Sequence, residues 1–235
     1  LDCQVVADRQ HKKGSILAFK ASISDGIGVI KMEQFSFVLT LFFMLLGPIK
    51  LLPAFAAATA GSDESFKRSV AIRAFLVASL VLAVLVLSGK ELLSEYQISL
   101  DGVRLAGGLV LLMSALRVIF PDAAPKQAGA GNATPMEVAV SPVAFPMIVP
   151  PAGVAAVLAF VMIAPEMPGL LRAIVLALTI IMILNWLAMH FHSKIMKIPG
   201  LMMALQVAGS VLVFVQAALG LETMLHALRS LGVIP

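Results

Sequence analysis

The chain has 235 residues, of which 60% are hydrophobic and 13% are charged, and its mean hydropathy is +1.01. Soluble domains average roughly 25% charged residues, so a chain this apolar cannot hide its surface from water and belongs in a lipid bilayer. A net charge of +4 would suggest nucleic acid for a soluble protein, but here it fits Lys and Arg in loops that face anionic lipid, and no nucleic-acid partner is expected.

Residues 1–31 form a long polar stretch at the N-terminal end. This stretch lacks an apolar region that ends in a small-residue cleavage site, so it does not match a signal peptide. Met32 stands just before the apolar run FSFVLTLFFMLL. We expect translation to start at Met32 and residues 1–31 to be a non-native or disordered leader. The single cysteine, Cys3, excludes an intrachain disulfide and a cysteine-based metal site.

Six segments are apolar over the length of about 20 residues that a membrane span requires. Short polar links separate them, and the link at 121–137 is rich in Pro, Gly and Ala, which predicts a flexible cytoplasmic linker. The sequence therefore predicts an all-α integral membrane protein with six transmembrane helices. The expected spans are 34–58, 70–90, 99–120, 138–164, 169–190 and 200–226.

Lys and Arg indicate the orientation, because they collect in cytoplasmic loops. Seven of them lie in or beside the links after the first, third and fifth spans, and four lie on the opposite side. This distribution predicts that those three links are cytoplasmic and that both termini are periplasmic. The first group is Lys67, Arg68, Arg73, Arg117, Lys126, Lys194 and Lys197, and the second is Lys90, Arg104, Arg172 and Arg229.

Two sequence matches at nearly the same offset indicate an internal repeat. The Ala-Gly pair at 106–107 recurs at 208–209, an offset of 102, and Pro48 recurs as Pro151, an offset of 103. Each copy would hold three spans, at 32–120 and 138–235. Because three is odd, the second copy must cross the membrane upside down, and such inverted repeats are common in secondary transporters.

Both copies carry helix-breaking residues in their first span. The stretch LGPIKLLP has Gly47 before Pro48. In the fourth span, a similar opening that faces the first would come from Pro142, Pro146, Pro150, Pro151 and Gly153. Proline cannot donate the helical hydrogen bond but suits the first position of a new helix, so we expect the first and fourth helices to be broken. The bare N-terminus of each second half would favour a carboxylate. The alternative is a pair of packing kinks in an inert bundle.

Three motifs in this order resemble the MarC family of bacterial inner-membrane proteins: GPIKLLPAF (47–55), RLAGGLVLLMSAL (104–116) and VSPVAFPMIVPPAGVAAV (140–157). The resemblance covers residues 34–230. Because some members are described as transporters of small neutral amino acids such as glycine and alanine, it implies a solute of that class. The family's first motif is usually Asn-Pro-Ile-Gly, where this chain has Gly47 and Lys50. Its second is usually Gly-Pro-Gly, where this chain has Pro150 and Ala152.

Lys50 and Asn185 are polar residues inside predicted spans. A charge near the bilayer centre costs about 3 kcal/mol or more, so Lys50 either attracts a substrate carboxylate or lies nearer one interface and extends its amine to water. Asn185 either hydrogen bonds the substrate or links helices, and Gln206 and Gln216 have the same two alternatives.

Glycine clusters in the third and sixth spans favour close packing of helices. The cluster at 106–108 contains Gly107 and Gly108, and the cluster at 208–210 contains Gly209. The alternative is a role in substrate binding, since backbone without a side chain can contact a ligand.

The sequence lacks enzyme motifs such as His-Glu-x-x-His and Gly-x-Ser-x-Gly, so we expect no enzyme, cofactor or metal site. His190 and His192 would point about 200° apart on a helix, which favours interfacial residues over metal ligands. The acidic residues lie outside the span centres, so a coupling ion would have to use backbone carbonyls, Asp101 or Lys50.

We therefore expect a multi-pass inner-membrane secondary transporter of a small neutral amino acid or a similar zwitterion. The alternatives are a non-transporting scaffold or regulator, and a channel of unknown substrate. The partners expected are the lipid bilayer, the solute and a coupling ion if one is used, while the sequence does not indicate an oligomeric state. The predicted substrate-binding residues are Gly47, Pro48, Lys50, Pro150, Pro151, Gly153, Gly107, Gly108 and Asn185.

Overall fold

The computed structural model describes residues 32–120 and 134–234, and within these ranges all regular structure is helical, as predicted. The expected leader at 1–31 and the linker residues 121–133 lie outside the described residues. The elements are α2 (Met32–Leu46), α3 (Pro48–Ala58), α4 (Glu64–Glu95), α5 (Leu100–Ile119), α6 (Pro135–Val138), η1 (Ala139–Ile148), α7 (Pro151–Ile163), η2 (Ala164–Glu166), α8 (Leu170–His190), α9 (His192–Ile195) and α10 (Leu201–Ser230).

Five helical segments of the described chain are long and apolar enough to cross a membrane, and they match predicted spans one, two, three, five and six. A sixth span results if Pro135–Ile148 and Pro151–Glu166, which are bent by 60° at the break between them, cross as one. This segment begins three residues earlier than the predicted span at 138. The reason is local, because Thr134 and Glu137 form a capping box that starts α6.

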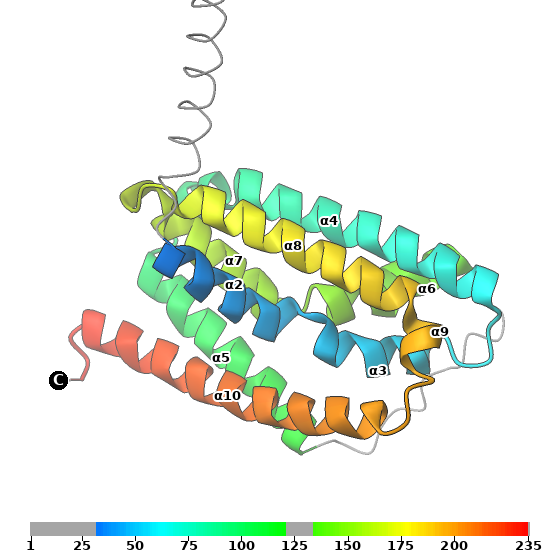
Figure 1. The fold of residues 1–235 in the computed structure, drawn as a ribbon. Coiled ribbons are helices and arrows are strands. Elements are labelled where there is room, and N and C mark those ends of the chain that lie inside the picture. Colours follow the sequence, from blue (N-terminus) through cyan, green and yellow to red (C-terminus); the bar gives the residue numbers. More distant parts are fainter. Residues whose placement is uncertain (1–31, 121–133, 235) are drawn as a thin grey trace, which may run out of the picture.

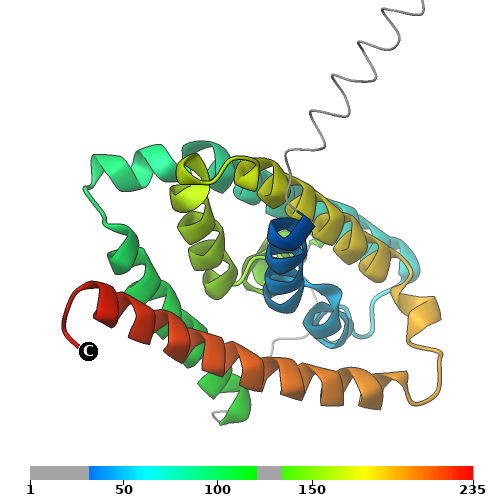
Figure 2. The same cartoon turned by 60° about the vertical axis from the view of Figure 1, so that its left-hand side comes forward.

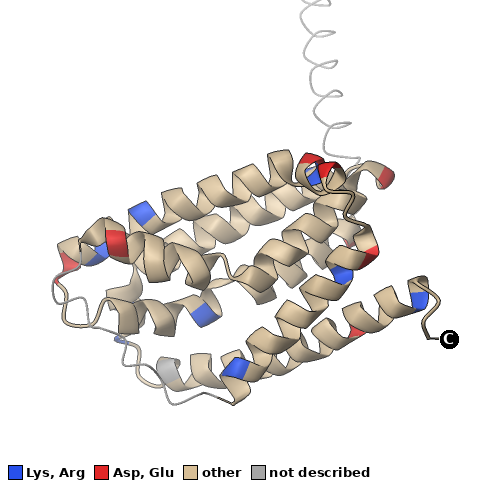
Figure 3. Ribbon diagram, turned by 180° about the vertical axis from the view of Figure 1, so that it is seen from behind, with Lys and Arg blue, Asp and Glu red and all other residues tan. Residues whose placement is uncertain are grey.

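The helices run side by side; α4 and α10 begin at one end of the bundle, and α5 and α8 begin at the other (Figure 1). The links after α3 and α8 meet at one end, where the Ser193 hydroxyl donates to both carboxylate oxygens of Glu64 at 2.6 and 2.8 Å. At the opposite end the Ser230 hydroxyl donates to Asp101 at 2.9 Å. Charged residues gather toward these two ends, and the ribbon between them is mostly uncharged (Figure 3), as expected for a protein that spans a bilayer.

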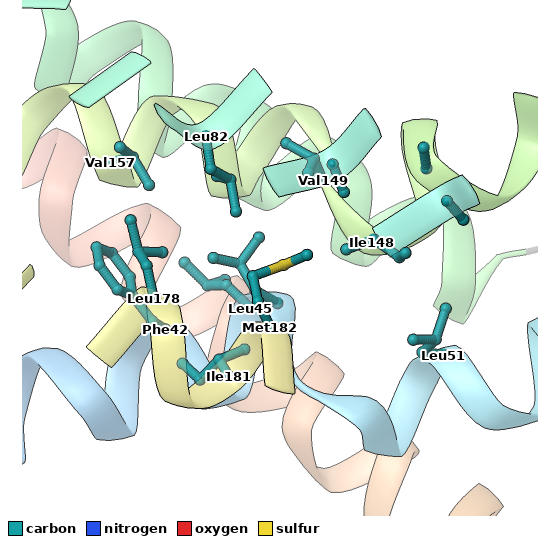
Figure 4. Close-up of a cluster of buried hydrophobic side chains, with 14 of the residues drawn as sticks. Phe42, Leu45, Leu51, Leu82, Ile148, Val149, Val157, Leu178, Ile181 and Met182 are labelled. Atoms are coloured by element: carbon teal, nitrogen blue, oxygen red, sulfur yellow. The ribbon is translucent and has the colours of Figure 1, made fainter. Parts of the chain in front are cut away.

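The helices form two pairs with the broken segments between them. Helices α5 and α10 cross on one side, α4 and α8 pack together on the other, and α2 and α7 lie between the pairs (Figure 2). The core between α2, α4, η1, α7 and α8 is apolar and fully buried at Phe42, Ile148, Val157 and Ile181 (Figure 4). Outward-facing side chains are also large and apolar, which suits contact with lipid rather than water.

Both expected helix breaks are present. Gly47 is extended, with φ −75° and ψ 167°, and Pro48 is the first residue of α3. Pro150 is extended in the same way, with φ −69° and ψ 155°, and Pro151 is the first residue of α7. Since proline has no N–H, neither Pro48 nor Pro151 can continue the hydrogen-bond ladder of the preceding helix.

The fourth segment is less regular than two half-helices joined at one break. Its first half contains two extended residues, Ser141 (φ −137°, ψ 123°) and Phe145 (φ −136°, ψ 122°), and each of them precedes a proline, Pro142 or Pro146. Proline disfavours the helical conformation of the residue before it, which explains both interruptions. The peptide bonds of Ser141–Pro142 and Phe145–Pro146 are cis.

Candidate functional site

The two helix breaks face a common cavity of about 180 Å³, which we call the central cavity. Its walls come from the break between α2 and α3, from α5, from the break between η1 and α7, and from α10. Three of the predicted site residues line it, namely Gly47, Lys50 and Pro150. The remaining lining residues are Leu45, Ala54, Ser114, Val118, Pro146, Met147, Ala152 and Gln216.

Lys50 is fixed in the central cavity by an amide from α10. Its Nζ donates a hydrogen bond to Gln216 Oε1 at 2.5 Å, and Gln216 Nε2 donates to the Leu111 carbonyl of α5 at 3.3 Å. Gln216 is 4% exposed, so this chain of contacts is held inside the bundle. Among the described residues, neither Asp nor Glu lines the cavity, and the ammonium group therefore has no counter-charge within it.

The beginnings of α3 and α7 add to the positive potential of the central cavity. The N-cap residues Gly47 and Pro150 line it, and Pro48 and Pro151 follow them as the first helical residues. The first N–H groups of a helix have no internal partner, and the aligned peptide dipoles place partial positive charge there. Together with Lys50, these two helix ends make the cavity complementary to a small anionic group such as a carboxylate.

Gly153 brings the two breaks together without lining the cavity. A Cβ at this position would lie 2.5 Å from Leu46 Cδ2, so the glycine lets the first turn of α7 rest against the end of α2. Asn185 of α8 is fully buried and donates from Nδ2 to the Leu46 carbonyl at 2.7 Å. The last carbonyls of a helix lack internal donors. This contact supports the helix-linking alternative for Asn185 and places it behind the cavity wall.

Gly107 and Gly108 lie outside the central cavity and serve helix packing. A Cβ on Gly107 would lie 3.1 Å from Ala155 Cβ of α7, and a Cβ on Gly108 would lie 2.6 Å from the Gly220 carbonyl of α10. Gly209 was expected to pack in the same way, and this prediction is wrong. Apart from its chain neighbours and the nearby backbone of its own helix, no described atom lies within 4 Å of its Cβ position, and the close partner on α10 is Gly220.

A second, larger cavity of about 370 Å³ lies between α2, α5, α7 and α10. Gly107 and Leu111 line it, while Arg104, Glu222 and His226 are its charged or ionisable residues. Leu45 lines both this cavity and the central one. The side chain of Leu45 is therefore the shared wall between the two.

Two polar residues that line the central cavity, Gln216 and Ser114, were not among the predicted substrate-binding residues. Gln216 was left with the same alternatives as Asn185, and the structure now separates them, because only Gln216 lines the cavity. Ser114 carries no sequence pattern that would have selected it. No group of three or more His, Cys, Asp or Glu side chains that could hold a metal ion occurs within 32–120 and 134–234.

Residues 32–228 match the sequence model of the MarC family of integral membrane proteins. The chain belongs to the MarC family. This match covers most of the chain and confirms the resemblance seen in the three motifs. It also shows that the protein is an integral membrane protein, in agreement with its apolar surface.

Three relatives illustrate the range of this MarC protein's similarities. The UPF0056 inner membrane protein YhgN of Escherichia coli K12 is 26% identical over 122 residues, which are 51% of this chain and 60% of YhgN. The UPF0056 membrane protein of Archaeoglobus fulgidus is 25% identical over 120 residues, covering 50% and 56% of the two chains. The UPF0056 membrane protein PH0760 of Pyrococcus horikoshii is 24% identical over 147 residues, covering 63% and 72%. The match to YhgN thus spans about 60% of that relative. No solved structure matches the chain.

Proposed function

We propose that this MarC protein is an inner-membrane secondary transporter that binds the carboxylate of a small neutral amino acid, or of a similar zwitterion, in the central cavity. The observation that carries the proposal is Lys50, a cation without a counter-charge in the cavity, placed where α3 and α7 begin. A buried charge is costly in a membrane and usually serves a ligand or a pathway. A carboxylate between the ammonium and the two helix ends would supply the missing negative charge.

The rest of the cavity supports a small zwitterion. A solute ammonium group needs acceptors, and the wall offers the Ser114 hydroxyl and the second lone pair of Gln216 Oε1, whose first accepts from Lys50. The volume of about 180 Å³ limits the solute to a small molecule. Ser114 is the one hydroxyl side chain among the described lining residues, and no His, Asp or Glu lines the cavity beside it or Lys50, so we propose no enzymatic activity.

We propose that the protein moves its solute by alternating access between two inverted triplets, 32–120 and 135–230. The pattern of helix contacts supports this repeat. The first halves of the two broken segments are α2 and η1; α2 packs on α8, and η1 packs on α4. The second halves are α3 and α7; α3 packs on α10, and α7 packs on α5. These matched pairs are what a pseudo-twofold axis through the molecule would generate.

A transporter accounts for the cavities better than a scaffold or an open channel. A scaffold has no need of a charged cavity at two facing breaks. A channel needs a continuous path, whereas Leu45 stands between the central and the larger cavity. We propose that displacement of this side chain connects the two cavities during transport.

The test is uptake of radiolabelled glycine and alanine into liposomes that contain the purified protein, with and without imposed proton or sodium gradients. We expect accumulation that depends on one gradient, and a loss of about 10- to 100-fold in Lys50→Met, since hydrogen bonds to charged groups contribute about 1.5–3 kcal/mol. Lys90→Met removes an exposed lysine of α4 and is the matched control, which should transport normally.

Other outcomes decide between the alternatives. Gradient-independent equilibration without accumulation would indicate a channel. No flux of either solute under any gradient would overturn the proposed substrate class. Normal uptake by Lys50→Met at equal protein content would remove Lys50 from the binding site.

A further inference from the structure

A basic hollow of about 300 Å³ lies at the end of the bundle where α4 begins and α8 ends, away from the central cavity. Arg68 contributes one guanidinium, and Lys194 and Lys197 contribute two ammonium groups from the link before α10. All three residues are exposed. His190 lines the same hollow.

The one carboxylate among the lining residues is already engaged. Glu64 accepts hydrogen bonds from the Ser193 hydroxyl on both of its oxygens and forms an ion pair with Lys67 at 3.4 Å. The three cations of the hollow therefore exceed its negative charge. A phosphate group fits such a cluster, because a guanidinium can donate two parallel hydrogen bonds to it and ammonium groups add point charges.

Aromatic side chains surround the basic hollow. The Trp186 and His190 rings stack with centroids 5.2 Å apart, and Phe191 meets His190 edge-on at 5.0 Å. The Lys194 ammonium lies 5.6 Å from the centroid of the Phe191 ring. Trp beside Lys and Arg at the end of a transmembrane helix is typical of the level of the lipid headgroups.

A separate apolar groove of about 320 Å³ lies further along the same two helices. Phe75 and Leu82 line it from α4, and they follow Arg68 at intervals of seven residues, which keeps all three on one helix face. On α8, Ile183 lines the groove and precedes His190 by seven residues. From Arg68 to Phe75, the rise of about 1.5 Å per residue gives roughly 10 Å, so the groove begins within the half of the hydrocarbon core, about 15 Å, that one leaflet occupies.

We propose that an anionic phospholipid binds lengthwise along α4 and α8, with its phosphate in the basic hollow and an acyl chain in the apolar groove. Free phosphate shares the chemistry of the headgroup, but it would leave the groove without an occupant. The alignment of the groove and the hollow along the same two helices favours the lipid. This site is separate from the central cavity, so its test is independent of the proposed transport.

The experiment measures binding of phosphatidylglycerol to the delipidated full-length protein in neutral detergent, by native mass spectrometry and by the thermal unfolding midpoint. We expect phosphatidylglycerol to bind and raise the midpoint, and phosphatidylcholine to do so far less. Arg68→Gln, Lys194→Gln and Lys197→Gln combined should weaken phosphatidylglycerol binding about 100-fold, since each basic residue near anionic lipid contributes about a factor of five. The matched control, Lys90→Gln, Arg117→Gln and Arg229→Gln, removes the same charge from exposed positions elsewhere and should bind normally.

Two further arms distinguish the sources of the phosphate. Ala83→Phe fills the apolar groove and should weaken phosphatidylglycerol binding without changing the basic hollow. Inorganic phosphate at millimolar concentration should neither raise the midpoint nor compete. The proposal is overturned if inorganic phosphate stabilises the protein as well as the lipid does, or if Ala83→Phe binds lipid normally. It is also overturned if the control triple variant loses as much affinity for lipid as the triple variant of the hollow.

Discussion

A single side chain, Asn185, hydrogen bonds the Leu46 carbonyl at the point where α2 ends. Inside the membrane, no water is present to donate a hydrogen bond to that carbonyl when the amide is removed. We therefore predict that Asn185→Leu lowers the free energy of unfolding by about 1–3 kcal/mol, the cost of an unsatisfied buried polar group. Polar contacts between membrane helices average about 0.6 kcal/mol. A larger loss would show that the hydrogen bond at this helix break stabilises the protein more than an average interhelical contact does. Unfolding in mixed detergent micelles measures this loss.

The control for Asn185 is Gln206→Leu, which removes an exposed amide from α10. This variant should leave the free energy of unfolding nearly unchanged. If Asn185→Leu were no more destabilising than Gln206→Leu, the amide would have no part in stabilising the helix break.

The buried imidazole of His192 should make the stability of the protein depend on pH. It is 8% exposed, it packs edge-on against Phe55 with ring centroids 5.3 Å apart, and neither ring nitrogen has a hydrogen-bond partner among the described residues. Burial lowers the pKa of His192, the positive charge of Lys67 lowers it further, and Glu64 opposes this shift. The folded protein therefore disfavours the protonated imidazole.

The sign of the pH effect follows from that pKa. Above the ordinary histidine pKa of about 6.5, the imidazole is neutral in both the folded and the unfolded protein, so its contribution to stability is constant. As the pH falls below about 6.5, the unfolded chain gains a proton that the folded chain resists, and stability declines. We predict that the unfolding midpoint falls between pH 7.5 and 5.5, and that His192→Leu reduces this fall. An equal fall in both proteins would assign the pH dependence to other groups.

At the scale of residues, sequence patterns predicted the features that depend on neighbouring residues, such as helix breaks. They left open the features that depend on contacts with distant residues. Gly47, Lys50 and Pro150 could be selected because a charge or a helix breaker is unusual in an apolar run wherever it occurs. Asn185 and Gln216 could not be told apart, since both are amides within a span. Their roles depend on partners 139 and 166 residues away, respectively Leu46 and Lys50.

Among the elements, the crossing of α5 and α10 leaves no room for a side chain at Gly220. A Cβ on Gly220 would lie 2.8 Å from the Gly108 carbonyl and 2.9 Å from the Leu112 nitrogen, and backbone atoms cannot move aside as a flexible side chain can. We predict that Gly220→Ala destabilises the protein by about 1–3 kcal/mol, as overpacking does. The free energy of unfolding in mixed micelles measures it.

Gly209 offers a control on the same helix, because its Cβ position is open. Gly209→Ala should be neutral or stabilising by up to about 1 kcal/mol, since alanine favours the helix. Equal effects of the two substitutions would contradict the packing of α5 against Gly220.

The mistaken choice of Gly209 has a physical cause. In water, the apolar face of a helix marks the side that packs, but α10 is apolar all round because lipid covers its outer side. The sequence therefore cannot show which of its glycines faces α5. Helix breaks are easier to predict, because proline acts on its own backbone and on the residue before it. Even so, one opening was expected in the fourth segment, whereas its backbone is also extended at Ser141 and Phe145.

For the molecule as a whole, the two halves of the chain have the same order of elements. Each half of the chain has a broken segment followed by two long helices, and the matched contacts of α2 with α8 and of η1 with α4 follow the same order. Composition alone was enough to place the chain in a membrane. It could not place α4 beside α8 or the basic hollow beside the apolar groove, because those contacts join distant parts of the chain.

The distribution of Lys and Arg between the two ends of the bundle predicts its orientation in the membrane. The C-terminal ends of α3, α5 and α8 lie toward one end of the molecule (Figure 1), and this end carries the larger share of Lys and Arg, so it should face the cytoplasm. In a Cys3→Ser background, we expect Glu166→Cys, at the opposite end, to react with a membrane-impermeant maleimide in intact cells. Ser62→Cys, in the link after α3, should react only after the membrane is permeabilised. The reverse pattern would invert the molecule in the membrane, and labelling of both positions in intact cells would contradict the alternation of the links between its two ends.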